Sequence, residues 1–302
     1  MSPIPSSMRA VRLHAPGDPS RLVEERVETP RPGPGEALVR VHAAALTRDE
    51  LDWPADRLPA IPSYELSGVV AAVGDGVEDV GVGEEVFALA SFDRDGAAAE
   101  YAVVAAAHLA RKPQTLGHVE SAAIPLAGLS AWQGLVDHGT LAAGERVLVH
   151  GAAGGVGSFA VQLARARGAH VIGTASSGGG DTARQLGADE VVDNSAERFE
   201  EVLAPVDLVF DTAGGELLER SPAILRDGGR LVSVAEEPGG EGLFFIVEPD
   251  RGQLAELGRL ADAGELRPLL DSVFPLAEAP AAFARSMEPG KRGKVVLRVV
   301  DD

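Results

Sequence analysis

A glycine-rich segment carries the clearest chemistry in the sequence. It runs from Gly151 to Gly157 and lies between an apolar run, Arg146–His150, and a segment of helical composition, Gly155–Arg167. Small residues let the backbone approach a pyrophosphate, and the first amides of the helix attract phosphates. The segment predicts a dinucleotide site, with a ligand-free turn as the alternative. Its predicted contacts are Ala152, Ala153, Gly154, Gly155, Val156 and Gly157.

The end of the next predicted strand suggests which dinucleotide binds. It reads Thr174-Ala-Ser-Ser177, where an NAD site would place an acidic residue for the ribose 2′-hydroxyl. Ser176 and Ser177 can donate hydrogen bonds to a 2′-phosphate, and Arg184 is the nearest cation, although a solvated helix position explains Arg184 equally well. This segment predicts NADP(H) as the cofactor, and Thr174 is a further predicted contact residue.

Strands and helices must position these residues. The chain up to about residue 112 is β-rich, with runs such as Glu36–Ala44 and Leu66–Val73. From Arg146 onward, short strands alternate with helices, which predicts βαβ units and a parallel sheet. The apolar tail strand, Lys294–Val299, needs a sheet to join. We expect it to return to the N-terminal β-rich part, with the α/β part as an insertion.

Composition limits the possible partners. The net charge of −19 argues against binding nucleic acid or an anionic membrane. Cysteine is absent, which removes disulfides, thiolate catalysis and zinc sites built on cysteine. We find no apolar run of about 18 residues that would span a membrane and no signal peptide, so we expect a cytoplasmic protein.

Several motifs together resemble the medium-chain dehydrogenase/reductase superfamily, in its zinc-free quinone oxidoreductase branch. Besides the glycine-rich turn, the motifs are Ala127-Gly-Leu-Ser-Ala-Trp132, Leu186-Gly-Ala-Asp189, Asp211-Thr-Ala-Gly-Gly215 and Arg292-Gly-Lys-Val-Val-Leu297.

This resemblance implies an α/β fold with two domains. A GroES-like β-rich catalytic domain would comprise residues 1–116 and 264–302, and a doubly wound Rossmann cofactor domain residues 117–263. The resemblance also implies a homodimer and further cofactor contacts at Ser130, Asn194, Thr212, Phe244, Phe245 and Ile246.

Departures from the zinc-dependent relatives are as informative as the matches. Those relatives carry a cysteine where this chain reads Leu46-Thr-Arg-Asp49, and a histidine where it has Tyr64. Because a zinc site needs about three protein ligands, we predict no metal here. An asparagine frequent near Thr47 in quinone reductases is missing, and so is a lysine in the loop after Ser177.

Without a metal, hydride delivery to a quinone or to an activated C=C of an enone or enoyl substrate needs the least assistance. The charge then develops on an oxygen that hydrogen-bond donors can stabilise. Tyr64 is the candidate proton donor, with a packed structural tyrosine as the alternative, and Thr47 would orient the substrate or the ribose. Trp53 and Phe92 would line the pocket or belong to the core. The alternative function is an NADPH-binding sensor or structural protein without turnover.

Three further polar residues have structural interpretations. Glu65 is expected to accept hydrogen bonds from backbone amides, and His42 and His150 are expected to be structural residues.

Overall fold

A computed structural model of the chain describes residues 3–54, 56–176 and 178–300. The chain forms two compact units. Unit 1 comprises residues 1–126, 249–263 and 270–302, and unit 2 comprises residues 127–248 and 264–269. The limits expected from the sequence, 116/117 and 263/264, differ from these because residues 117–126 and 249–263 belong to unit 1.

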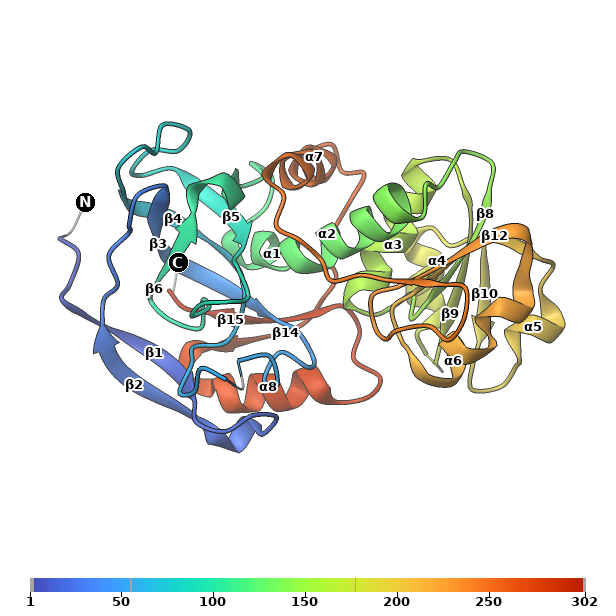
Figure 1. The fold of residues 1–302 in the computed structure, drawn as a ribbon, viewed down its shortest axis with the longest axis horizontal. Helices are drawn as coiled ribbons and strands as arrows, with labels where there is room; N and C mark the ends of the chain where they lie inside the picture. Colours follow the sequence, from blue (N-terminus) through green and yellow to red (C-terminus); the bar gives the residue numbers. More distant parts are fainter. Residues whose placement is uncertain (1–2, 55, 177, 301–302) are drawn as a thin grey trace. The chain divides into compact units, whose positions relative to one another are not determined.

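Unit 1 is built on a mostly antiparallel sheet (Figure 1) with the strand order β14-β15-β3-β4-β5-β7, and β6 pairs with β3. A separate hairpin joins β1 to β2. Its strands are β1 (Ser7–Leu13), β2 (Leu22–Glu28), β3 (Glu36–Leu46), β4 (Glu65–Val73), β5 (Glu85–Leu89), β6 (Tyr101–Ala105), β7 (Ala110–Arg111), β14 (Leu270–Pro275) and β15 (Lys294–Arg298). Its helices are α1 (His118–Ala122), α7 (Arg251–Asp262) and α8 (Ala279–Met287), with 3-10 turns η1 (Pro19–Arg21), η2 (Ala106–His108) and η5 (Leu276–Glu278).

The tail strand joins unit 1, as the sequence predicts. β15 pairs antiparallel with β3, and Val295 lies opposite Leu46. Val295 and Leu297 are buried in the core of this unit together with Phe283 of α8. An apolar strand gains its stability by covering such a core, so residues from both ends of the chain build one sheet.

Unit 2 contains a six-stranded parallel sheet with the order β10-β9-β8-β11-β12-β13. Its strands are β8 (Arg146–His150), β9 (His170–Ala175), β10 (Glu190–Asp193), β11 (Val206–Asp211), β12 (Leu225–Ser233) and β13 (Leu243–Phe244). Its helices are α3 (Gly155–Ala166), α4 (Gly180–Leu186), α5 (Phe199–Val202) and α6 (Gly215–Arg220), with η4 (Ser221–Ile224). The helical segment α2 (Pro125–Trp132) and η3 (Gln133–His138) contains the boundary between the units.

The strand order reverses direction between β8 and β11. From β8 the chain proceeds outward through β9 and β10, and then it returns to the other side of β8 with β11. In open parallel sheets, ligands bind outside the carboxyl ends of the strands at such a switch point. The fold therefore directs attention to the residues that follow His150 and Asp211.

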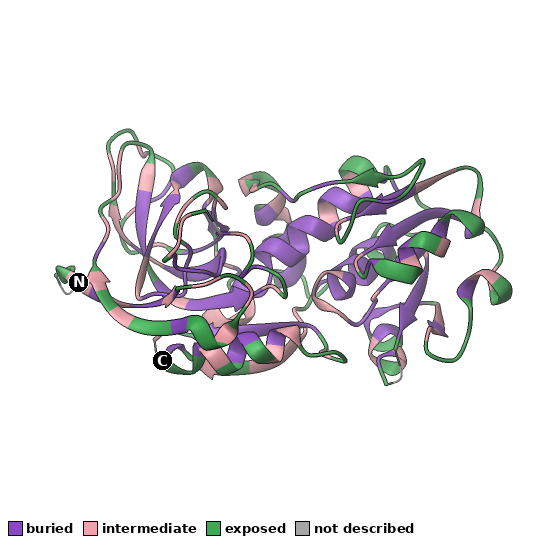
Figure 2. Cartoon of the chain, turned by 60° about the horizontal axis from the view of Figure 1, so that its bottom comes forward, coloured by how far each residue is buried: buried purple, intermediate pink, exposed green. Residues whose placement is uncertain are grey.

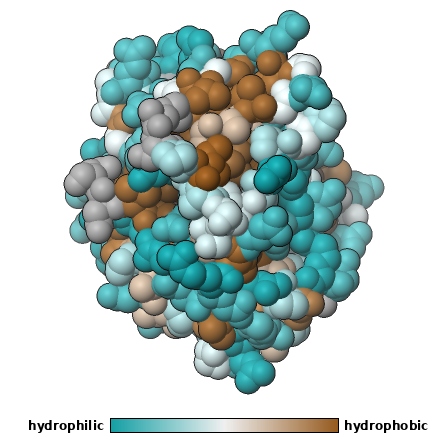
Figure 3. Space-filling view, turned by 90° about the vertical axis from the view of Figure 1, so that its left-hand side faces the viewer, coloured by the Kyte–Doolittle hydropathy of each residue, from teal (hydrophilic) through white to brown (hydrophobic). Residues whose placement is uncertain are grey.

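Burial follows the two sheets. Buried residues run along the strands and along α2 in Figure 2, while loops and outer helix faces are exposed. On the face shown in Figure 3, hydrophilic side chains predominate and apolar ones gather mainly in the upper half. The acidic composition accounts for much of this polarity.

Candidate functional site

The glycine-rich turn leaves β8 and enters α3 with very little space. A Cβ atom at Gly157 would lie 2.1 Å from the carbonyl oxygen of Gly151, and one at Gly154 would lie 3.1 Å from the same oxygen. Gly151 has a φ of 72°, in the left-handed region that favours glycine. The turn therefore needs its glycines, and no side chain caps the first amides of the 12-residue helix that follows, so they can bind an anion.

The second strand end at the switch point lies beside this turn. The Thr212 hydroxyl donates to the carbonyl oxygen of His150 at 2.7 Å. Asp211 accepts hydrogen bonds from the Ser233 hydroxyl at 2.8 Å and from the Gly214 amide at 3.1 Å. Burial raises the pKa of the Asp211 carboxyl above its ordinary value. The Asp211 carboxylate thus fixes the conformation of the Asp211–Gly215 loop through these hydrogen bonds.

His150 holds the base of the turn. It is fully buried, and its ring nitrogens lie 3.0 Å from the Thr174 hydroxyl and 2.9 Å from the Ser221 hydroxyl. Burial lowers the pKa of His150 to about 3, so the ring is neutral and structural, as the sequence analysis expects. The Thr174 hydroxyl also lies 3.4 Å from the Gly151 amide, which makes Thr174 a support of the turn.

Three buried side-chain oxygens in unit 2 lack a hydrogen-bond partner among the described residues, and one of them, on Asp207, forms an ion pair with Arg226. The other two are the Ser130 hydroxyl oxygen and the Asn194 side-chain oxygen. Buried polar atoms are usually paired, so each of these fits a polar ligand group better than a closed core. The switch point, the glycine turn and these two residues together suit a dinucleotide. The Ala153 amide and the first amides of α3 would hold its phosphates, whereas the Ala152 amide donates to the carbonyl oxygen of Thr174 at 2.9 Å.

Most of the other predicted cofactor residues that the structure describes lie at the surface of unit 2, and Phe245 is buried. Ser176 is exposed, and Ser177 lies outside the described residues. Arg184 is exposed and forms an ion pair with Asp181 at 3.1 Å, which is the solvated helix position considered above. Phe245 is buried against the His138 ring, with the ring centroids 4.6 Å apart, whereas Phe244 and Ile246 are exposed.

A buried charge network in unit 1 surrounds Thr47. The Lys294 ammonium lies 3.2 Å from the Thr47 hydroxyl and pairs with the Glu65 carboxylate. The second oxygen of Glu65 accepts the Leu126 amide at 2.9 Å, which confirms its expected backbone contact. Burial, with the charge of Lys294, lowers the pKa of Lys291 to about 8. The Thr47 hydroxyl is therefore held by the ammonium group of Lys294.

Glu50 lies in the same region and is fully buried. Neither carboxylate oxygen has a hydrogen-bond partner among the described residues. Burial raises the pKa of Glu50 well above its ordinary value, although the charge of Lys294 opposes the shift. A protonated Glu50 is the form that such an environment favours. The sequence alone does not indicate this, because Glu50 follows Asp49 in an apparently polar segment.

Tyr64 lies in an aromatic cluster of unit 1. Its ring centroid is 5.7 Å from that of Trp53 and 5.3 Å from that of Phe92. The Arg57 guanidinium lies 3.4 Å from the Tyr64 hydroxyl and 2.6 Å from the carbonyl oxygen of Phe92. Tyr64 is buried, and burial raises the pKa of its hydroxyl. Thr47 and Tyr64, the two predicted catalytic residues, thus have different polar partners.

Sequence reasoning does not find Arg57. It lies seven positions before Tyr64, and the prolines at 59 and 62 argue against a regular helix or strand that would relate the two side chains. The sequence shows only that an arginine lies close to Tyr64, the aromatic residue predicted to donate a proton. The contact depends on the irregular segment between β3 and β4, and Arg57 is the one polar side chain seen to contact the Tyr64 hydroxyl among the described residues.

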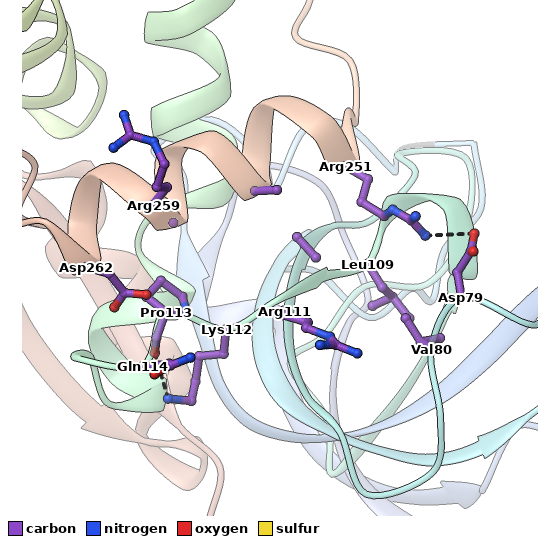
Figure 4. Close-up of a pocket in the computed structure, with 13 residues that line it drawn as sticks. Asp79, Val80, Leu109, Arg111, Lys112, Pro113, Gln114, Arg251, Arg259 and Asp262 are labelled. Carbon is purple, nitrogen blue, oxygen red and sulfur yellow. Dashed lines mark hydrogen bonds and ion pairs between the residues drawn. The ribbon is translucent and has the colours of Figure 1, made fainter.

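A pocket of about 420 Å³ also lies in unit 1, between α7 and the segment around β7 (Figure 4). Its charges are largely matched within the protein, since Arg251 pairs with Asp79 at 2.9 Å and Lys112 donates to the carbonyl oxygen of Leu116 at 2.7 Å. Asp262 accepts the Thr115 amide at 2.9 Å. These side chains complete the local fold, and none of the predicted site residues lines this pocket.

Neither a cluster of metal-binding side chains nor a membrane-spanning helix is found among the described residues. No group of three or more His, Asp or Glu side chains in residues 3–54, 56–176 and 178–300 is arranged to hold a metal ion. No helix in the same part of the chain has the length and apolar character needed to cross a membrane.

These features define a protein with an antiparallel GroES-like unit and a Rossmann-like unit that carries a dinucleotide turn. Residues 33–114 match the alcohol dehydrogenase GroES-like domain family, and residues 186–297 match the zinc-binding dehydrogenase family. The chain belongs to the medium-chain dehydrogenase/reductase superfamily, in its quinone oxidoreductase-like branch.

Individual relatives cover nearly the whole chain. A probable zinc-binding oxidoreductase, mitochondrial, from Arthroderma benhamiae is 32% identical over 98% of this chain and 98% of its own. The NADPH-dependent alkenal/one oxidoreductase, chloroplastic, from Arabidopsis thaliana is 31% identical over 91% of this chain and 75% of its own. The solved quinone oxidoreductase from Coxiella burnetii is 30% identical, with a TM-score of 0.92 over 97% of this chain and 100% of its own.

Proposed function

We propose that this protein is a zinc-independent, NADPH-dependent oxidoreductase that delivers hydride to a quinone or to an activated C=C of an enone or enoyl substrate. The observation that carries the proposal is the tight Gly151–Gly157 turn at the switch point of the unit 2 sheet. The names of the relatives, which include NADPH-dependent alkenal/one and quinone oxidoreductases, support the coarser class of NAD(P)H oxidoreductase.

The residues of the chain divide the work between the units. The amides of Ala153 and Val156 would hold the cofactor phosphates, Gly154 would leave room for them, and Ser130 and Asn194 would meet the polar groups of the cofactor. When bound, a reduced nicotinamide supplies the hydride. In unit 1, Thr47 would orient the substrate and Tyr64 would donate a proton. Arg57 is placed to hold the Tyr64 hydroxyl.

Zinc independence is supported by the side chains themselves. The sequence contains no cysteine, and it has Leu46-Thr-Arg-Asp49 and Tyr64 in the regions where the zinc-dependent relatives carry a cysteine and a histidine. A preference for NADPH is supported by the absence of an acidic residue in Thr174–Ser177. A homodimer and a cytoplasmic location are also proposed, on the resemblance and on the sequence respectively.

Tyr64→Phe tests the proposed chemistry. Loss of a positioned proton donor should lower kcat on the order of ten-fold or more, while the affinity for NADPH stays unchanged. Steady-state rates in EDTA should be compared across quinones, enones and enoyl thioesters. Turnover of a confirmed substrate by Tyr64→Phe at the wild-type rate contradicts the role of Tyr64. No turnover with any acceptor favours the sensor alternative.

The choice of cofactor is tested separately. NADPH should bind more tightly than NADH, because neutral hydroxyls can donate hydrogen bonds to a 2′-phosphate, whereas a carboxylate would repel it. Fluorescence titration of the wild-type protein with both cofactors measures the two values of Kd. Equal or tighter binding of NADH rejects the preference for NADPH without affecting the reaction class.

A further inference from the structure

Lys291 differs from the other lysines of the chain in having no polar partner among the described residues. It lies in the turn Gly290–Gly293 between α8 and β15, where both glycines have positive φ values, of 75° and 74°. Its ammonium group makes no hydrogen bond or ion pair with residues 3–54, 56–176 or 178–300, although the residue is only partly exposed. A Cβ at Gly290 would meet no atom within 4 Å, so the turn is open beside the lysine.

The carboxylates near Lys291 are already held by other groups. Asp271 and Glu65 both attract the Lys291 charge. Asp271 accepts the Arg285 guanidinium at 2.7 and 2.8 Å, and Glu65 pairs with Lys294. Neither carboxylate forms an ion pair with Lys291, so its charge stays without a direct counterion within the described residues.

Positive neighbours and burial make this amine easy to deprotonate. Burial is the larger effect, and the like charges of Lys294 and Arg48 add to it, so the pKa of Lys291 falls to about 8. At that pH about half of the Lys291 side chains carry the free amine, whereas an ordinary lysine with a pKa near 10.5 is almost entirely protonated. A free amine is a nucleophile, and an ammonium group is not.

The other lysines are enclosed and paired. The sequence contains three lysines, Lys112, Lys291 and Lys294. The Lys112 side chain is 7% exposed, pairs with Glu85 at 3.4 Å and donates to two backbone carbonyl oxygens. The Lys294 side chain is 4% exposed and pairs with Glu65. Lys291 therefore combines access from solution with a free amine in a way that the other two do not.

We propose that Lys291 is a covalent modification site for carbonyl compounds that carry a negatively charged group. The free amine attacks the carbonyl carbon, a C–N bond forms, and the carbonyl oxygen leaves as water with two protons from the amine, which gives an imine. This step needs no oxidant or reductant and is independent of hydride transfer. Arg48, which is exposed and has no ion pair among the described residues, attracts the negative group.

4-Formylbenzoate tests the site, because it joins an aldehyde to a carboxylate. The full-length protein is treated with this aldehyde and cyanoborohydride at about pH 8, which converts the imine into a stable secondary amine. Peptide mass spectrometry then measures the labelled fraction of each lysine. We expect Lys291 to be labelled on the order of ten-fold more than Lys112 or Lys294, because its amine is deprotonated and accessible. Lys291→Arg should remove this label, whereas Lys112→Arg should retain it.

A neutral aldehyde separates reactivity from attraction of the negative group. Methyl 4-formylbenzoate should label Lys291 several-fold more slowly, when both rates are expressed relative to those of Nα-acetyl-lysine. Arg48→Gln should reduce this preference, and Arg111→Gln, at an arginine of unit 1 whose side chain is 78% exposed, should leave it unchanged.

Two results would overturn the inference. Label spread equally over the three lysines, or found only at the amino terminus, shows that Lys291 is not a distinct reactive site. Equal relative rates with the two aldehydes show that the site does not select a negative group. Neither result bears on hydride transfer, so the proposed function is tested separately.

Discussion

Glu50 shows how strongly one buried side chain can make the stability of unit 1 depend on pH. Its pKa is raised by burial, so the folded protein keeps the proton at a pH where the unfolded chain, with an ordinary value near 4.5, has released it. Above that pH the native state binds more protons than the unfolded state, and the free energy of unfolding therefore decreases as pH rises. This decrease continues until the pH passes the folded pKa.

Glu50→Gln should remove this dependence, because the amide cannot ionise. We expect the variant to be more stable than wild type above the folded pKa of Glu50, with a flatter profile from about pH 4.5 upward. Urea unfolding at several pH values measures the difference. Glu78→Gln, a substitution at an exposed position of the same unit, should follow the wild-type profile. Parallel profiles for Glu50→Gln and wild type would show that Glu50 is not protonated in the fold.

Individual site residues differ in how far the sequence reveals them. The glycines of Gly151–Gly157 are predictable, because a local turn between a strand and a helix imposes their spacing. Arg57 and Glu50 are not, since their significance arises from irregular backbone and from burial that only the tertiary structure creates. Arg184 is a cation close in sequence to the end of the second strand, but nothing in the sequence requires it to contact the cofactor. In the structure it is exposed and forms an ion pair with Asp181.

At the scale of the secondary-structure elements, the turn between β8 and α3 is tightly constrained. Gly157→Val would direct a side chain into the Gly151 carbonyl oxygen, 2.1 Å from the position of the new Cβ. We expect unit 2 to lose about 2 kcal/mol or more of stability and NADPH to bind at least ten-fold more weakly. Thermal unfolding and fluorescence titration measure both effects.

The matched control is Gly239→Ala in a loop of the same unit. A Cβ at Gly239 meets no atom within 4 Å, and Gly239 has no positive φ. This variant should bind NADPH like the wild type. If Gly157→Val also retains normal affinity, the turn does not hold the cofactor and the central observation of the proposed function is lost.

Strand and helix positions were predictable where the pattern was long and regular. The expected helix Gly155–Arg167 corresponds to α3, and the tail strand to β15. The composition of Leu217–Leu225 predicts a helix there, and this prediction is wrong at both ends. The helix begins at Gly215, changes to a 3-10 turn at Ser221–Ile224 around Pro222, and Leu225 already belongs to β12. The sequence also predicts a strand over Leu243–Val247, of which the structure has only Leu243–Phe244, at the edge of the sheet.

At the scale of the whole molecule, each unit has a hydrophobic core of its own among the described residues. One core includes Val41, Leu66 and Leu297 of unit 1, and the other includes Leu148, Ile172 and Val209 of unit 2. The sequence predicts this division because the β-rich and α/β patterns alternate along the chain. It does not predict the division limits to the residue, since α1 packs on β3 and β4 of unit 1. The limits of the functional domains stay a prediction.

Because each unit has its own core, the two units can unfold separately. A cofactor that binds one unit should then stabilise that unit and leave the other unchanged. NADPH held by the Gly151–Gly157 turn should stabilise the native state of unit 2 alone, by about 2.7 kcal/mol at a concentration of 100 times Kd. Differential scanning calorimetry should therefore resolve two transitions, of which saturating NADPH raises one by several degrees. In Gly157→Val neither transition should respond to NADPH. A single wild-type transition that moves as a whole would show instead that the two units unfold as one cooperative body.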